Sequence, residues 1–309
     1  MRATISLFRR EFTAYFLSPI AYVVLTVFLI VTGQLFYLAL NLLTETNHRG
    51  TDYPMQVLLG DERFWLVFLF IPPLLTMRLF AEERATGTLE MLMTAPIRDW
   101  QVVASKYLAC LGFYLVMWLP TLVYLPVLTD TTIVWMGEHL GGKVAVFVGL
   151  VLALAGVVVG FTPSADRVPT GLMFWLGTVM VGGGLLANVR FETGIDPWPV
   201  VSAYVGVVFA GAMFLALGLF VSSLVRSQLV AAIVSLVLSL GFVVTAFWTP
   251  ELETGSLGYR VVSFFSVPLH FDRDFARGLI DTRHLVLYGS VTLFCLFLTV
   301  RSLESRRWK

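Results

Sequence analysis

Residues 80–100, FAEERATGTLEMLMTAPIRDW, form the densest run of charge in the first half of the chain. Long apolar stretches flank this run, LVFLFIPPLL (66–75) before it and VVASKYLACLGFYLVMWLP (102–120) after it. A short polar connector between two such segments is typical of an α-helical protein that crosses a membrane more than once. The stretch therefore indicates the fold class, and its own role depends on the side of the membrane that it faces.

The composition excludes a soluble fold. Of the 309 residues, 58% are hydrophobic and 13% are charged, whereas a soluble domain carries about 25% charge. The net charge of +1, without a basic face, gives no reason to expect nucleic acid as a partner. Cys110 and Cys295 lie in apolar runs, and the four histidines lie in connectors without ligand spacing. We therefore predict no metal site and no disulfide framework.

Eight segments are apolar for long enough to cross a bilayer as helices, since a spanning helix needs about 20 mostly apolar residues. They are continuously apolar and do not alternate, which excludes barrel strands and predicts an all-α bundle. Pro72 and Pro73 remove two backbone donors from the second segment and should kink it. The predicted spans are 19–43, 64–80, 102–128, 144–161, 171–188, 200–221, 229–248 and 285–300.

The distribution of Lys and Arg favours cytoplasmic positions for both termini. In that orientation 13 of the 21 basic residues lie on the inner side, but only 7 of the 20 acidic residues do. Basic residues concentrate in the cytoplasmic loops of membrane proteins. Residues 80–100 are then cytoplasmic, and the outward connectors are 44–63, 129–143, 189–199 and 249–284.

Residues 1–18 are predicted to form an amphipathic elbow helix at the membrane surface, ahead of a transmembrane domain over 19–309. Ser18 and Pro19 break this helix and begin the first span. The basic and acidic residues Arg9, Arg10 and Glu11 fall away from the apolar face. At helical spacing, that face consists of Ile5, Phe8, Phe12, Tyr15 and Phe16.

Ionisable residues are nearly absent from the predicted spans. Arg78 and Lys106 fall near the cytoplasmic ends of the second and third spans, and elsewhere the eight spans contain no Asp, Glu, Lys, Arg or His. Intramembrane charges mark ion paths and proton relays, so the pattern argues against an ion-coupled carrier and an intramembrane hydrolase. We assign no catalytic residue and no cofactor to the chain. Any energy for transport must come from a partner.

The segment GEHLGGKV (137–144) matches the G-x-x-x-x-G-K pattern of a phosphate-binding loop, but Val144 replaces the hydroxyl residue that would hold Mg²⁺. It also lies in an outward connector without a preceding strand. We interpret it as a loop that enters the fourth span.

Small residues form stripes in two spans, where they let helices approach closely. In the sixth span the stripe runs from Gly206 and Ala210 to Ala216. Packing within the bundle is favoured over a subunit interface for both stripes. The stripe in the fourth span includes Gly149, Ala153, Gly156 and Gly160.

Gly87 divides the charged connector into two helical parts, because glycine takes a turn without a Cβ clash. Before it, the second span continues into water as a helix. After it, a short helix is capped by Gly87 or Thr88 and carries Glu90 in its first turn, where the helix dipole favours an acid. This helix is rich in Leu and Met, and Pro96 ends it.

The connector can also be interpreted as an ordinary solvated loop with cytoplasmic charge. That interpretation predicts an excess of Lys and Arg. Instead, Glu82, Glu83 and Glu90 outnumber Arg84. We therefore favour a helix that docks on a cytoplasmic protein.

The chain resembles the ABC-2 type permeases, the membrane halves of ATP-binding-cassette exporters, and among them the gliding-motility-associated branch. The resemblance covers both ends and most of the middle of the chain, and EERATGTLE followed by a proline is its most specific part. The matching stretches are FRREFTAYFLSPIAYVV, IPPLLTMRLFAEERATGTLEMLMTAPI, LPTLVY, GLFVSSLVRSQLVA and HFDRDFARGLIDTRHLVLYGSV with the terminal RSLESRRW.

The resemblance implies that residues 80–100 hold the coupling helix, which seats in a cleft of a separate ATPase subunit. It implies two ATPase copies that bind ATP and Mg, a second permease copy or related permease, and a bacterial inner membrane. An accessory membrane subunit with a large extracytoplasmic domain is a further possible partner. The docking residues carried over are Glu82, Glu83, Arg84, Gly87, Thr88, Glu90 and Pro96.

One region departs from the six-span pattern of that family. Residues 130–198 insert two further spans between the usual third and fourth, joined by the cytoplasmic turn VGFTPSADRVPTGL (159–172). In the outward segment 249–284, the family has short helices that dip back at the outer leaflet. There Phe271, Phe275 and Leu279 can share one helical face, and Asp281 or Thr282 can cap the last span. An amphipathic helix on the outer surface fits equally well.

Two functional hypotheses follow. The favoured one is the permease subunit of an ABC-2 exporter, without ATPase chemistry of its own. The alternative is a membrane scaffold that anchors the other subunits of such a complex and has no transport pathway. The sequence does not name a substrate.

Overall fold

The computed structural model describes residues 2–44, 54–88, 97–123, 198–248 and 256–307. The chain divides into two units, one comprising 1–120 with 197–309 and the other 121–196. The second unit lies almost wholly outside the described residues, and so do the predicted fourth and fifth spans and the stripe at Gly149, Ala153, Gly156 and Gly160. The regular structure of the described ranges is helical, with no strand among them.

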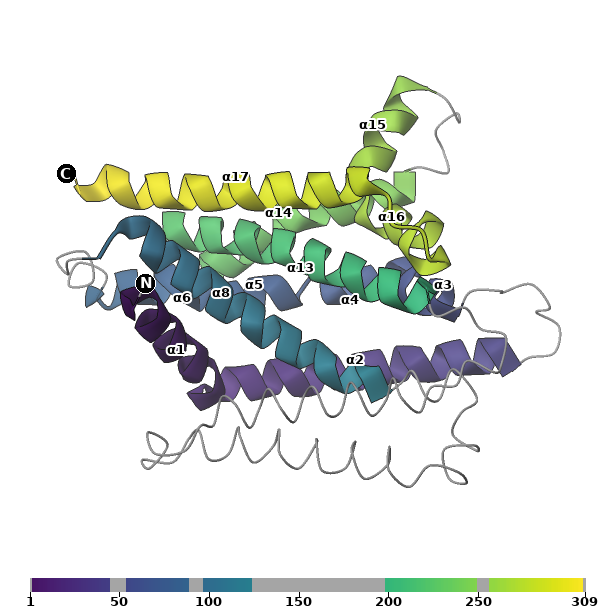
Figure 1. Ribbon diagram of the computed structural model, residues 1–309, viewed down its shortest axis with the longest axis horizontal. Coiled ribbons are helices and arrows are strands. Elements are labelled where there is room, and N and C mark those ends of the chain that lie inside the picture. Colours follow the sequence, from purple (N-terminus) through teal and green to yellow (C-terminus); the bar gives the residue numbers. More distant parts are fainter. Residues whose placement is uncertain (1, 45–53, 89–96, 124–197, 249–255, 308–309) are drawn as a thin grey trace. The chain divides into compact units, whose positions relative to one another are not determined.

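The described helices are labelled along the chain in Figure 1. They are α1 (Arg2–Leu17), α2 (Pro19–Thr44), α3 (Pro54–Leu59), α4 (Glu62–Phe68), α5 (Ile71–Thr76), α6 (Arg78–Ala85), α8 (Asp99–Trp118), η1 (Leu119–Val123), α13 (Trp198–Leu224), α14 (Gln228–Trp248), α15 (Leu257–Phe265), α16 (Val267–Arg273), η4 (Phe275–Arg277) and α17 (Thr282–Arg307).

Five segments in the described ranges are long and apolar enough to cross a membrane, or six if the bent pair α1–α2 counts as one span. They match the predicted first, second, third, sixth, seventh and eighth spans. The chain is therefore a multi-pass helical membrane protein, and the prediction of eight spans stays a prediction. The five are Phe64–Ala85, Asp99–Leu122, Trp198–Leu224, Gln228–Trp248 and Thr282–Ser305.

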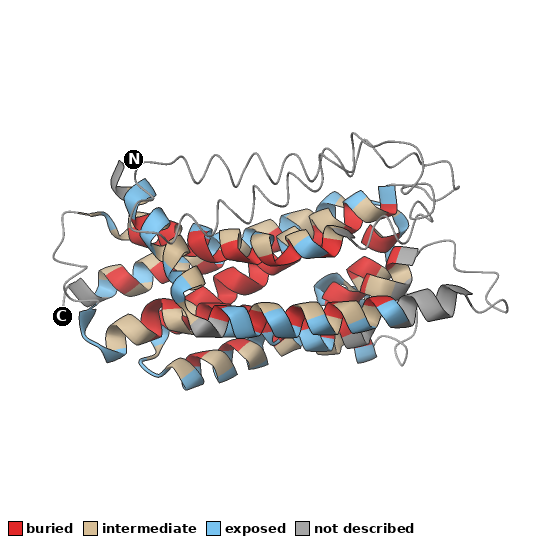
Figure 2. Cartoon of the chain, turned by 90° about the horizontal axis from the view of Figure 1, so that it is seen from below, coloured by how far each residue is buried: buried red, intermediate tan, exposed pale blue. Residues whose placement is uncertain are grey.

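Helix α13 is the most enclosed of these spans, with 72% of its apolar window buried, against 28% for α14 and 22% for α17. Buried residues gather on the sides of the helices that face one another (Figure 2). Small residues permit this enclosure. A Cβ atom on Gly206 would lie 2.8 Å from the rings of Phe271 and Phe275, and one on Gly211 would lie 2.3 Å from the Tyr114 ring. The stripe in this span therefore packs within the bundle, as predicted.

The second span is divided into α4, α5 and α6. The chain turns at Leu69 and Phe70, just before the Pro72–Pro73 pair, and the helix is interrupted again at Met77. Proline cannot donate to the preceding turn, which explains the first break. Phe70 and Met77 keep helical dihedral angles and Phe64–Ala85 remains one membrane-capable segment, so the predicted kink stays a prediction. Beyond the second break, α6 continues the span to Ala85, as expected for a helix that leaves the apolar region.

The N-terminal residues are helical, and α1 meets α2 at an angle of 68° across Ser18. The position of α1 at the membrane surface stays a prediction. Helix α1 packs along α8, where the rings of Tyr15 and Phe113 stack at 5.2 Å and Phe8, Phe12 and Phe16 form a row. Ile5, one turn earlier, is 65% exposed and does not pack on α8, so its place on a membrane-facing apolar face stays a prediction. The packed face is therefore aromatic and begins at Phe8, with Leu7 also buried.

The outward segment forms the short helices α15, α16 and η4. The prediction that Phe271, Phe275 and Leu279 share one helical face is wrong for Leu279, because α16 ends at Arg273 and Gly278 takes φ +87°. The turn buries Phe271 and Phe275 completely and leaves Leu279 60% exposed. Asp281 caps α17 as expected: its Oδ1 accepts a 2.8 Å hydrogen bond from the Arg283 amide.

Candidate coupling site at the end of the second span

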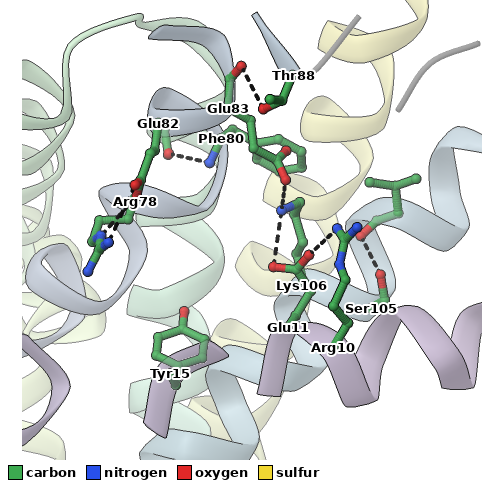
Figure 3. Close-up of polar contacts among 12 residues, drawn as sticks. Arg10, Glu11, Tyr15, Arg78, Phe80, Glu82, Glu83, Thr88, Ser105 and Lys106 are labelled. Carbon is green, nitrogen blue, oxygen red and sulfur yellow. Dashed lines mark hydrogen bonds and ion pairs between the residues drawn. The ribbon is translucent and has the colours of Figure 1, made fainter. Parts of the chain in front are cut away.

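A buried lysine joins three helices where the second span ends (Figure 3). Lys106 on α8 donates hydrogen bonds from its Nζ to Glu83 Oε1 on α6 at 2.7 Å and to Glu11 Oε2 on α1 at 3.2 Å. Its side chain is only 3% exposed. One ammonium group therefore links α1, α6 and α8.

The surroundings of Lys106 explain why its charge can be buried. Two carboxylates face the ammonium, and the Phe80 ring lies 5.4 Å from it, in range for a cation–π interaction. Burial alone would raise the pKa of Glu11, but Lys106 and Arg10 hold that pKa below its ordinary value. Glu11 is thus kept ionised and supports the buried cation.

Sequence reasoning identifies Lys106 only as a basic residue on the cytoplasmic side. A signal is present, because Lys106 lies inside an apolar run and Glu11 lies in a helix that is otherwise aromatic and basic. Their separation of 95 residues hides the pairing. A charge in an apolar span generally has a partner, which is the rule that could prompt a search for one.

Two further contacts fix α6. Arg78 donates to Glu82 Oε2 at 2.9 Å one turn later and to the Ser18 hydroxyl at the bend between α1 and α2. Arg84 Nη1 donates to the Val225 carbonyl, just beyond α13, at 3.4 Å. Helix α6 is therefore connected to elements on either side of it.

The break at Met77 is closed by a hydroxyl from α13. Ser222 Oγ accepts from the amides of Phe80 at 3.1 Å and Ala81 at 3.2 Å, and it donates to the Met77 carbonyl at 3.2 Å. Phe80, Ala81 and Ser222 are buried, and Met77 is half-buried. Such partners are needed because a broken helix inside a membrane has no water to satisfy its backbone groups.

The chain turns at Gly87, as predicted. Helix α6 ends at Ala85, and Gly87 takes φ +73°, where an added Cβ atom would have no neighbour within 4 Å. Thr86 donates to the Glu82 carbonyl and Thr88 donates to the Glu83 carbonyl, so both hydroxyls cover the end of α6. A glycine is favoured at position 87 because the backbone there is left-handed, and not because a neighbouring atom would clash with a side chain.

The structure brings together five of the seven predicted docking residues. Glu82, Glu83 and Arg84 lie on α6, and Gly87 and Thr88 follow in the turn. Glu90, Pro96 and the rest of the helix predicted after Gly87 lie outside the described residues. Glu83 faces inward to Lys106, which gives it a structural contact in addition to its predicted docking role.

Comparison with known proteins supports the assignment to a class of membrane protein. Residues 17–165, just under half of the chain, match the family model described as ABC-2 family transporter protein. The match includes the broken second span, the charged connector and α8. This match suggests that the chain is the permease subunit of an ABC transporter. Such a subunit is the membrane component, and the ATPase is a separate subunit. No curated protein and no solved structure matches the chain.

Proposed function

We propose that the chain is the membrane-spanning permease subunit of an ABC-2 type exporter in a bacterial inner membrane, with both termini cytoplasmic. Two ATPase subunits would dock on residues 80–100, and two permease chains would form the pathway. The gliding-motility-associated branch is part of the same proposal. Its support is the family match over 17–165 together with the sequence resemblance.

The observation that carries the proposal is the way α6 is held. A docked ATPase would act on the connector that follows α6. Any displacement would then pass to α1 and α8 through Lys106 and to α13 through Ser222. Rigid-body motion of packed helices is the usual means by which such forces change access to a pathway.

The experiment is co-purification of the full chain with its ATPase, followed by transport and ATPase assays in proteoliposomes. Gly87→Pro and Glu90→Arg should both weaken assembly and coupling, because proline cannot take the φ of +73° at position 87. Glu304→Arg is the matched control, since Glu304 is an exposed glutamate that pairs only with nearby Arg301 among the described residues. Survival of both assembly and transport in the two connector variants would exclude the docking role.

The same assay separates the permease from the scaffold alternative. A permease should couple added substrate to a rise in ATPase activity. A flat response over candidate lipids and polymers, with assembly intact, would instead support a scaffold, for which the additional residues 130–198 are the motivation.

A further inference from the structure

A cavity of about 350 Å³ lies at the same end of the first unit. Its walls come from α1, α2, α5, α6 and α8 and from the turn after α6. It shares Glu82, Glu83 and Thr88 with the connector proposed to dock the ATPase and opens from these residues toward α1 and α2. The size is within the range of small-molecule sites.

One wall of the cavity is apolar. It is made by side chains from the two membrane-spanning segments and α1, namely Ala14, Ala21, Val24, Leu74, Leu75 and Leu79. Water alone would fill the space beside this wall poorly, because it would find no hydrogen-bond partners there.

The other wall is polar and carries charges of both signs. Glu82 pairs there with Arg78, and Glu11 and Glu83 pair with Lys106. Thr86 and Thr88 complete this wall. A hydrocarbon chain alone is therefore also a poor occupant, since it would cover ionised groups without replacing their water. An occupant that suits both walls is an amphiphile with a charged head.

The charges also indicate which head group fits. Lys106 is engaged by two carboxylates, and Glu11 is also paired with Arg10. Arg78 and Glu82 pair with each other at 2.9 Å, but both remain partly exposed, with side chains 33% and 41% accessible, so each can take a further partner. An anion can pair with Arg78, and an ammonium can pair with Glu82 and with Glu83, whose Oε2 accepts no hydrogen bond from the described residues.

We propose that this cavity binds the head group and first acyl carbons of a zwitterionic lipid that carries a primary ammonium, of the phosphatidylethanolamine type. The phosphate contacts Arg78, the ammonium contacts Glu82 and Glu83, and the acyl carbons lie along Ala21, Val24 and Leu75. A bound lipid would separate α1 and α2 from α6 on one side of the Lys106 contacts. Placement in the cytoplasmic leaflet rests on the orientation under the proposed function, whereas binding itself does not.

The test is lipid binding to the purified full chain, measured by native mass spectrometry with phosphatidylethanolamine, phosphatidylcholine and phosphatidylglycerol of identical acyl chains. Phosphatidylethanolamine should bind about tenfold more tightly than phosphatidylcholine, since a quaternary ammonium cannot donate the charge-assisted hydrogen bonds. Equal binding of the three lipids would overturn the proposal. Binding of free phosphoethanolamine as tight as that of the lipid would overturn the choice of a lipid.

Two variants localise the site without depending on transport. Ala14→Trp fills the cavity from an exposed position of α1, and Leu17→Trp, also exposed but not lining the cavity, is its control. Glu82→Gln keeps the size of the side chain and removes its charge. Phosphatidylethanolamine binding should fall in Ala14→Trp and its preference over phosphatidylcholine should fall in Glu82→Gln. Unchanged binding in Ala14→Trp together with an unchanged preference in Glu82→Gln would place the lipid elsewhere.

Discussion

Two buried polar clusters lie at opposite ends of the first unit and are built from different chemistry (Figure 1). At the end that contains α6, Lys106 pairs with Glu11 and Glu83. At the end that contains α16, the rings of His270 and His284 stack with centroids 3.7 Å apart. The first cluster consists of opposite charges, and the second contains His270, whose pKa is lowered by its burial.

The hydrogen bonds of the second cluster define its protonation. His270 Nε2 lies 3.1 Å from the Ser263 carbonyl, which only accepts, so this nitrogen carries the proton. His270 Nδ1 therefore accepts from the Tyr288 hydroxyl at 2.8 Å. Burial, and then the neighbouring His284, lower the pKa of His270 to about 3. His270 is thus neutral, while His284 contacts Asp274 Oδ2 at 2.8 Å.

The two clusters show that different interactions stabilise the two ends of the first unit. Ion pairs around Lys106 hold α1, α6 and α8 together. Aromatic packing and a neutral histidine hold the outward segment, and acid weakens them. Three predictions can break or sharpen this comparison.

The largest effect is expected for Lys106→Met. Removal of the cation leaves Glu83 and Glu11 in a largely buried site without their shared partner, which should lower the free energy of unfolding by about 3 kcal/mol. SDS titration of the purified protein in mixed micelles, followed by circular dichroism, measures this change. Arg301→Met, which breaks the exposed pair with Glu304, should cost no more than about 0.5 kcal/mol.

A second substitution shows whether the unpaired buried charge causes the loss of stability in Lys106→Met. Lys106→Met combined with Glu83→Gln should recover part of the loss, because the buried carboxylate that lacked a partner is gone. Equal losses in the single and double variants would mean that Lys106 acts mainly through its packing.

The next largest effect is expected for Ser222→Ala at the same end. It leaves the amides of Phe80 and Ala81 without the hydroxyl in a buried site, at a cost of about 2 kcal/mol. The same SDS titration applies. Ser223→Ala is the matched control, because Ser223 donates only to the Phe220 carbonyl of its own helix and should have a small effect. Similar losses in the two variants would contradict the bridging role of Ser222.

The smallest effect is a pH dependence confined to the other cluster. An unfolded histidine has a pKa of about 6.5, so as the pH falls the unfolded chain takes up a proton before folded His270 does. Neutral His270 therefore makes its full contribution to the free energy of unfolding above about pH 6.5. Below that pH the free energy of unfolding falls by up to about 1.4 kcal/mol per pH unit. Unfolding measured between pH 7.5 and 5.5 should show this slope. Replacement of His270 with Gln should reduce it, and Lys106→Met should not.

Much of the fold follows from the sequence because long apolar runs and prolines act locally. The ends of α13 and α14 lie within a few residues of the predicted spans, and the turn at Gly87 and the cap at Asp281 are predicted from single residues. The docking role of the connector remains a prediction. Local signals define where a helix begins and ends, but they do not define its neighbours.

The long-range contacts do not follow from the sequence. The sequence places the histidines in connectors without ligand spacing, yet His270 and His284 stack because the chain reverses at Gly278 between them. Lys106 and Glu11 meet only because α1 folds back along α8. In each case tertiary packing, not helical periodicity, brings the side chains together.

The hydrogen bonds to the Ser222 hydroxyl also restrict how α6 can move relative to α13. The amides of Phe80 and Ala81 converge on this single oxygen atom of α13. Sliding α6 along α13 would remove both hydrogen bonds together, whereas a rotation of α6 about that oxygen keeps the donors within reach. The break in the second span is therefore a pivot, and tilt is the motion of α6 that its contacts with α13 permit.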